Sequence, residues 1–119
     1  MKKPRLNYVE LPVADGPAAK AFYERAFGWK LTDFGPTYHA TTSGDVDIGL
    51  DASQPQSLDA PLPVIEVDDL VSALAAVGKA GGTITKPIFA FPGGRRFHFR
   101  DPAGNQLAVW QAAGHASSS

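Results

Sequence analysis

The chain has 119 residues, of which 44% are hydrophobic and 19% are charged, and it contains no cysteine. A domain of that length can bury a hydrophobic core without disulfides or structural metal ions. The lack of cysteine excludes disulfides, thiolate metal sites and a cysteine nucleophile. With 11 basic and 12 acidic side chains, the net charge of −1 offers no broad attraction for nucleic acid or anionic membranes. No apolar stretch approaches a membrane span or a signal peptide, so we expect a cytoplasmic protein.

The first half of the chain reads as a strand, a helix and three further strands. Residues 6–13 are rich in β-branched and aromatic side chains, which is typical of a strand. Asp15 can cap the following helix, Pro17 suits its first turn, and Gly28 can take the positive φ that ends it. Short strands are predicted at 29–34, 37–42 and 46–50, between turns rich in glycine, proline and serine.

The second half repeats this order of elements. A strand at 62–67 is followed by Asp68 or Asp69 as the helix cap, and a glycine pair at 81–82 ends the helix. The buried stripe of that helix is predicted to be Leu70, Val71, Leu74 and Val77. Three strands then follow at 83–88, 95–100 and 106–110.

The sequences of the two halves align at a constant shift of 54 positions, which pairs Val13 with Val67 and Gly28 with Gly82. We therefore predict an α+β fold of two βαβββ modules. In a four-stranded sheet that one helix covers on one side, the other face must either be buried or line a site. Two such faces can enclose a cavity between them. The predicted organisation is one domain with a module at 5–51, a linker at 52–61, a module at 62–111 and a disordered tail at 112–119.

Strand alternation assigns side chains to the concave face. Four strands contribute to it: Tyr8, Glu10 and Pro12; Leu62, Val64 and Glu66; Arg96, His98 and Arg100; and Gln106, Ala108 and Trp110. This face mixes aromatic, acidic and cationic groups, as a small-molecule site does. The face of His39 cannot be assigned from the alternation.

Several of these residues have both a chemical and a structural interpretation. His98 is a candidate general base or ligand, or else a hydrogen-bonded packing histidine. Glu10 and Glu66 are candidate acid–base groups if they converge, and otherwise partners for inward arginines. Together with His98 they could also hold a metal.

The aromatic and cationic candidates are also open to two interpretations. Tyr8 and Trp110 could stack on a planar ligand or simply fill the cavity. Arg96 could balance ligand charge, whereas Arg95 reads as a solvated hairpin tip. The aromatic residues around the end of the first helix are predicted to be core: Phe22, Tyr23, Phe27 and Trp29. No phosphate-cradling motif or nucleophile elbow is present.

Two segments resemble a known family. Phe22-Tyr23 with Phe27-Gly28-Trp29, and the run Asp101 to Asn105 (DPAGN), are similar to motifs of the vicinal oxygen chelate superfamily, which includes glyoxalase I, extradiol dioxygenases and bleomycin-binding proteins. The resemblance covers residues 5–111 and implies a glyoxalase/bleomycin-resistance-like curved eight-stranded sheet and a homodimer.

Metal-using members of that family take their ligands from the first and last strands of each module. The matching positions here are Tyr8, Leu62, Ala108 and one residue within 47–49. Leucine and alanine side chains have no donor atom, and a tyrosinate is costly at neutral pH. The resemblance therefore implies no standard metal site and no cofactor, with the orientation of Asp47 left open.

The favoured function is metal-independent binding of a small organic molecule in the cavity. Tyr8, Arg96 and Trp110 would contact the ligand, and Glu10, Glu66 and His98 would supply polar groups. The alternative is a glyoxalase-related lyase or isomerase that uses His98 or one of the glutamates as acid or base, with or without a divalent metal. A third possibility is a protein-interaction domain.

Overall fold

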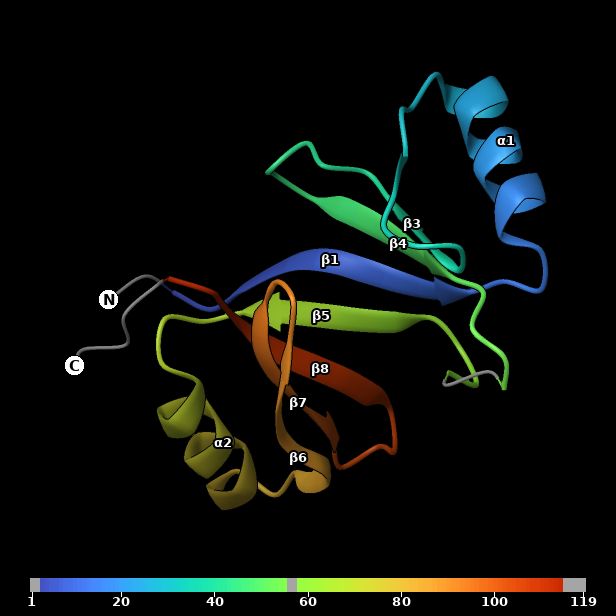
Figure 1. The fold of residues 1–119 in the computed structure, drawn as a ribbon. Coiled ribbons are helices and arrows are strands. Elements are labelled where there is room, and N and C mark those ends of the chain that lie inside the picture. The colour runs from blue at the N-terminus through green and yellow to red at the C-terminus, as the bar shows by residue number, and fades with distance from the viewer. Residues whose placement is uncertain (1–2, 56–57, 115–119) are drawn as a thin grey trace. The chain divides into compact units, whose positions relative to one another are not determined.

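A computed structural model describes residues 3–55 and 58–114 of the chain, so the predicted tail from residue 115 onward lies outside the described residues. The described residues form eight strands and two helices in the order βαβββ–βαβββ, which confirms the predicted α+β fold (Figure 1). Their bounds are β1 Arg5–Pro12, α1 Gly16–Phe27, β2 Thr32–Asp33, β3 Tyr38–Ala40, β4 Asp47–Asp51, β5 Leu62–Glu66, α2 Leu70–Lys79, β6 Thr83–Phe91, β7 Gly94–Arg100 and β8 Gln106–Ala112. Among the described residues, contacts group 7–62 into one compact unit, and group 63–114 together with 3–6 into another. We call these units the first module and the second module.

The first module has the strand order β2-β3-β4-β1. β1 runs parallel to β4, and the other neighbours are antiparallel. α1 begins where predicted, because the Asp15 carboxylate accepts a hydrogen bond from the Ala18 amide at 3.0 Å. It ends at Gly28, whose φ of 71° is left-handed.

The aromatic residues at the end of α1 are not core, which corrects the sequence prediction. Phe22, Phe27 and Trp29 remain 56%, 61% and 42% exposed, and they pack with Tyr23 in a cluster of rings. α1 has 12 residues, whereas the strands that it contacts, β3 and β4, have three and five, so the shorter of the two leaves part of the helix uncovered.

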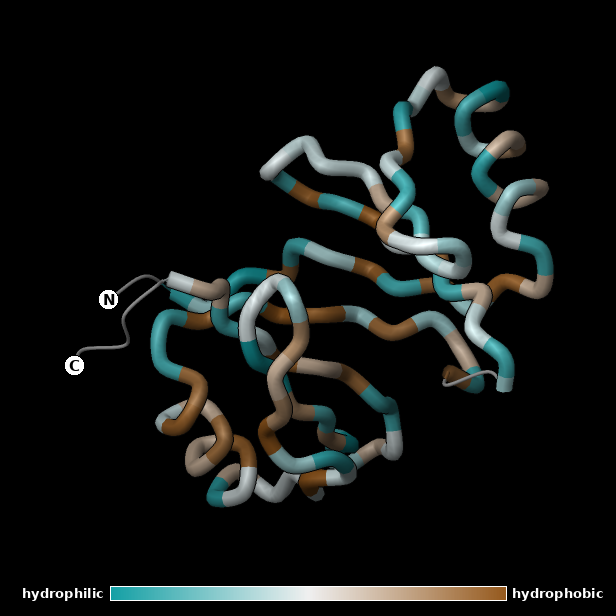
Figure 2. Tube along the Cα trace, in the orientation of Figure 1, coloured by the Kyte–Doolittle hydropathy of each residue, from teal (hydrophilic) through white to brown (hydrophobic). Residues whose placement is uncertain are grey.

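The second module has the strand order β5-β8-β7-β6, with β5 parallel to β8 and the other pairs antiparallel. Its core is formed by Leu70, Phe97 and Val109, which are at most 3% exposed. The partly buried residues around them are Val67, Ala73, Leu74, Val77, Ile84, Ile88 and Phe99. Figure 2 shows the corresponding run of hydrophobic residues along α2. Val71 is the exception to the predicted stripe, because it is 60% exposed on the outer side of the helix.

Polar side chains fix the start of α2 and the turn between β7 and β8. Asp69, one of the two predicted caps, accepts a hydrogen bond from the Ser72 amide at 3.1 Å. The buried Gln111 side chain accepts a hydrogen bond from the Leu70 amide at 2.9 Å and so ties α2 to β8. The Asp101 carboxylate accepts hydrogen bonds from the Ala103 and Asn105 amides, as the DPAGN turn predicts.

β6 is longer than predicted and reaches Phe91. Its register with β7 shifts between Ile84 and Lys86 and again between Lys86 and Phe89. This irregularity accommodates Pro87, which cannot donate a ladder hydrogen bond. Neither helix of the described residues has the length and apolar character that a membrane crossing requires.

Candidate functional site

The strand register of the second module aligns side chains in two rows on the face opposite α2. Because Phe97 and Val109 pack toward α2, their neighbours along each strand point to the other face. One row consists of Glu66, Trp110, Arg96 and Phe89 on four successive strands. The next row consists of Val64, Ala108, His98 and Lys86. Four of the predicted site residues, Glu66, Arg96, His98 and Trp110, therefore share this face.

Rings and cations alternate across these rows, and we call Lys86, Phe89, Phe91, Arg96 and Trp110 the aromatic–cationic cluster. The Arg96 guanidinium lies 5.5 Å from the Phe89 ring centroid and 5.6 Å from that of Phe91. The Lys86 amine lies 4.6 Å from the Phe89 centroid, and Phe91 packs beside Trp110 at 6.3 Å. These distances are those of cation–π and aromatic contacts, so the cluster presents flat rings next to positive charge. Sequence reasoning missed Phe89 and Phe91, because the predicted strand ended at residue 88.

His98 lies at the edge of this cluster and is only 5% exposed. Its ring centroid is 5.7 Å from that of Phe89. Burial, followed by the charges of Arg96 and Lys86, lowers the pKa of His98 from 6.5 to about 4, so the imidazole is neutral at pH 7. Nδ1 is 3.4 Å from the Gln106 amide nitrogen, and Nε2 has no hydrogen-bond partner within the described part of the chain.

The first module has a different polar group on the face opposite α1. The Tyr38 hydroxyl donates a 2.7 Å hydrogen bond to the Glu10 carboxylate, and the hydroxyls of Tyr8 and Tyr38 are hydrogen-bonded to each other. Glu10 is 6% exposed. Burial, and then the negative charge of Glu10, raise the pKa of Tyr38 well above its usual range, so this phenol stays protonated. The structure thus joins the predicted Tyr8 and Glu10 through Tyr38, which sequence reasoning did not select.

The same side chains explain why residue 49 is a glycine. Gly49 lies opposite Glu10 on β1 and opposite Ala40 on β3. A Cβ there would overlap the hydroxyl oxygens of Tyr8 and Tyr38 and would lie 2.7 Å from Tyr38 Cζ. The absence of a side chain on β4 leaves the space in which the two phenols meet.

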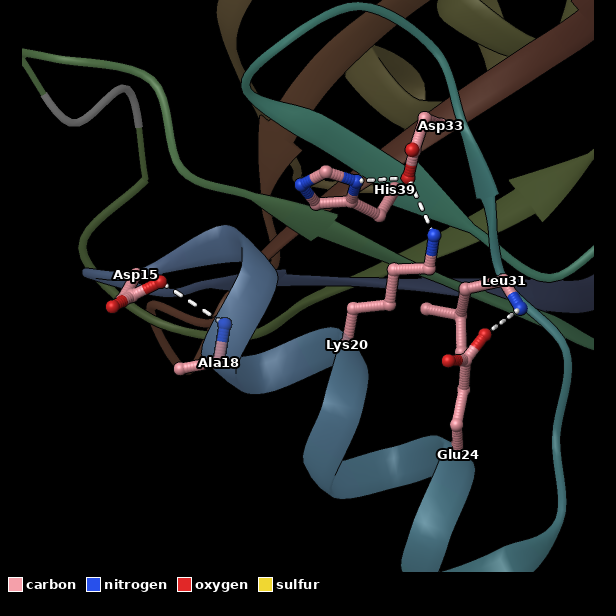
Figure 3. Close-up of polar contacts among 7 residues, drawn as sticks. All are labelled: Asp15, Ala18, Lys20, Glu24, Leu31, Asp33 and His39. Carbon is pink, nitrogen blue, oxygen red and sulfur yellow. Dashed lines mark hydrogen bonds and ion pairs between the residues drawn. The ribbon is translucent and has the colours of Figure 1, made fainter.

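His39, whose face the sequence left open, points toward α1. Its Nδ1 lies 2.7 Å from the Asp33 carboxylate, which also accepts a 2.9 Å hydrogen bond from Lys20 on the helix (Figure 3). Lys20 and His39 both lower the pKa of Asp33, with the larger effect from Lys20. The imidazole packs closely on Gly16, where a Cβ would lie 2.5 Å from Nε2. These contacts attach α1 to β2 and β3, so we assign His39 a structural role.

The positions that hold metal in the resembled family do not form a donor set here. Leu62 and Ala108 are 2% and 0% exposed and offer only hydrocarbon. The Asp47 carboxylate turns back to accept hydrogen bonds from Thr41 Oγ1 at 2.7 Å and from the Ser43 amide at 2.8 Å. Within residues 3–55 and 58–114, no three His, Asp or Glu side chains are arranged to hold a metal ion. The chemistry of these residues does not fit the family's divalent cation.

Comparison with known proteins gives a consistent family assignment. Residues 5–109 match the model of the "Glyoxalase/Bleomycin resistance protein/Dioxygenase superfamily". The chain is 32% identical over a 120-residue alignment to "Putative glyoxylase CFP32" of Mycobacterium bovis and to the protein of the same name in Mycobacterium tuberculosis. The alignment covers 92% of this chain but 46% of those relatives, so the chain spans about half of their length.

Solved structures show the same fold at low sequence identity. Methylmalonyl-CoA epimerase from M. tuberculosis superimposes with a TM-score of 0.73 at 14% identity, over 97% of this chain and 92% of that one. The Mn(II)-bound glyoxalase from Novosphingobium aromaticivorans superimposes with a TM-score of 0.65 at 23% identity, over 92% of this chain and 40% of that one.

Proposed function

Because the chain belongs to the glyoxalase/bleomycin resistance protein/dioxygenase superfamily, we propose that it binds a small organic molecule on the second-module face opposite α2, without a metal ion. The observation that carries this proposal is the buried, neutral His98 beside the aromatic–cationic cluster. A face that combines flat rings, cations and one orienting polar group has the composition of a small-molecule site. Glu66 and Trp110 extend the same row and complete the set of contacts that we assign to the ligand.

The alternative enzymatic role for His98 is less well supported by its electrostatics. An imidazole with a pKa of about 4 is a much weaker proton acceptor than one at 6.5, since each unit corresponds to about 1.4 kcal/mol. General-base catalysis at neutral pH favours a pKa near the working pH. Glu10, another of the three candidate bases, already accepts a hydrogen bond from Tyr38. Both groups are better suited to hydrogen bonding than to proton abstraction.

Thermal shift with a panel of small aromatic compounds tests the proposal, in EDTA and again with Mn²⁺, Ni²⁺ or Zn²⁺. We expect compounds that raise the melting temperature to do so equally in EDTA, because ligand binding stabilises the native state without a metal. Arg96 and Arg95 are neighbours on opposite faces of β7, so Arg96→Gln should reduce the shift whereas Arg95→Gln should not. A shift that requires metal, or that Arg95→Gln abolishes equally, would contradict this function.

We also propose that the chain forms a homodimer through the aromatic end of α1. Phe22, Phe27 and Trp29 are 42–61% exposed. They leave on the order of 300 Å² of aromatic surface, enough to form the apolar centre of an interface that needs about 800 Å² per partner. Light scattering after size exclusion should give twice the chain mass, and Phe27→Ser should reduce it to one chain. Val71→Ser, at an equally exposed position on α2, is the control, and a monomeric wild type would refute the pairing.

A further inference from the structure

With the Gln106 amide oriented as it is in the structure, its contact with His98 indicates which ring nitrogen carries the proton. Nδ1 lies 3.4 Å from the amide nitrogen of Gln106, which can only donate. In a neutral imidazole whose Nδ1 accepts, the proton resides on Nε2. The buried Nε2–H of His98 is therefore a hydrogen-bond donor.

This donor has no acceptor among the described residues. A buried N–H that is left unpaired is unfavourable, and most such groups in folded proteins are paired with protein or with ordered water. His98 is 5% exposed, so bulk water does not satisfy it. Nε2–H can therefore be satisfied by a buried water or by the acceptor atom of a ligand that displaces it.

The charge of the surrounding face selects the kind of acceptor. The register of the second module places three cations on this face, Lys86, Arg96 and Arg100, against one carboxylate, Glu66. An anionic acceptor would therefore be favoured over a neutral one, and a cation would be repelled. Carboxylates are the common organic anions that pair with guanidinium groups in this way.

The aromatic side chains on this face favour a ligand that also contains a flat ring. Phe89 lies 5.7 Å from the His98 ring, and Phe91 and Trp110 continue the apolar surface along the same face. A flat ring can stack on these side chains while its acid group reaches His98 and Arg96. Lys86 is exposed, and its amine lies 4.6 Å from the Phe89 ring centroid, so a positive charge stands beside this ring surface.

From these observations we propose that the second-module face is selective for a small aromatic carboxylate, one oxygen of which accepts the Nε2–H of His98. The inference rests on the proposed binding function and adds the chemical class of the ligand. Arg96 compensates the carboxylate charge, and Phe89, Phe91 and Trp110 contact the ring.

Calorimetric titration with three matched probes tests this selectivity in EDTA. Benzoate carries the anionic acceptor, benzamide a neutral acceptor, and benzylamine a cation. We expect benzoate to bind at least about tenfold more tightly than benzylamine, with benzamide between them. Arg96→Gln should bring benzoate to the affinity of benzamide and leave benzamide unchanged, and Arg95→Gln should change neither.

The outcomes distinguish an error in the proposed ligand class from an error in the proposed binding function. If benzamide or benzylamine binds as tightly as benzoate, the carboxylate class is wrong although the face binds ligands. If none of the three probes binds but other compounds of the thermal-shift panel do, this inference fails and the proposed function stands; if no compound of the panel binds, both fail. A readout without any substitution is the ¹⁵N resonance of His98 Nε2 in the wild type, which should move on addition of benzoate while Nδ1 stays unprotonated. An unmoved Nε2 resonance at saturating benzoate would overturn the assignment of His98.

Discussion

Gly49→Ala tests whether the Tyr8–Tyr38–Glu10 group is a close-packed unit. The new methyl group would overlap both phenol oxygens, so the hydroxyls must move, and we expect this shift to disrupt the 2.7 Å bond from Tyr38 to Glu10. Overpacking costs about 1–3 kcal/mol, and loss of a hydrogen bond to a buried charged group about 1.5–3 kcal/mol. We therefore expect the free energy of unfolding to fall by about 3–5 kcal/mol, a large part of the stability of a domain of this size.

Urea denaturation followed by circular dichroism measures this loss as a lower midpoint at an unchanged slope. Gly78→Ala is the matched control, because its Cβ would meet nothing within 4 Å and alanine favours the helix that contains it. It should raise stability by about 0.5–1 kcal/mol. The overlap also predicts coupling: Tyr38→Phe and Gly49→Ala together should cost less than the two single changes added. A Gly49→Ala protein within about 0.5 kcal/mol of the wild type would refute the packing described here.

Three further outcomes follow from the second module. The pKa of His98 is lowered to about 4 from 6.5, so the unfolded chain binds a proton that the folded chain does not between these values. The contribution of neutral His98 to the free energy of unfolding should be fully present above pH 6.5 and should fall by roughly 2–3 kcal/mol toward pH 4, after allowance for solvent screening. In a plot of urea midpoint against pH, His98→Gln should flatten this part of the curve. Gln111→Met leaves the buried Leu70 amide without an acceptor and should cost about 1–3 kcal/mol in the same assay, and no loss would exclude that bond. Leu70→Ala should cost about 2–5 kcal/mol whereas Val71→Ala, one position along, should change stability by less than about 0.5 kcal/mol; equal losses would contradict their different burial, 0% and 60%.

Much of the fold could be predicted from local sequence signals, because those signals are themselves structural causes. Asp15 and Asp69 cap the helices in the structure by accepting backbone hydrogen bonds, as short acidic residues before an apolar run predict. The period-two pattern also placed Phe97 on the helix-packed face and its neighbour His98 on the other. Such signals act within a few residues and need no knowledge of distant contacts.

The errors occurred where distant geometry decides the outcome. The apolar spacing of Phe22 and Phe27 suits a buried stripe, but the shorter of the two strands that α1 contacts leaves part of the helix uncovered. Tyr38 was not selected because its partner Glu10 is 28 positions away and the two meet only through β4. Phe89 was lost because a register shift in β6 carries the strand past the proline that usually ends one. Strand length, register and pairing are properties of the assembled sheet, which periodicity alone does not encode.

The decisive experiment for the role of His98 is a crystal structure of the EDTA-treated protein with benzoate. We expect a flat molecule against Phe89, with a carboxylate oxygen about 2.9 Å from His98 Nε2 and the Arg96 guanidinium beside it. Benzoate bound away from the face that carries His98, or bound there with Nε2 still unpaired, would show that His98 does not bind the carboxylate.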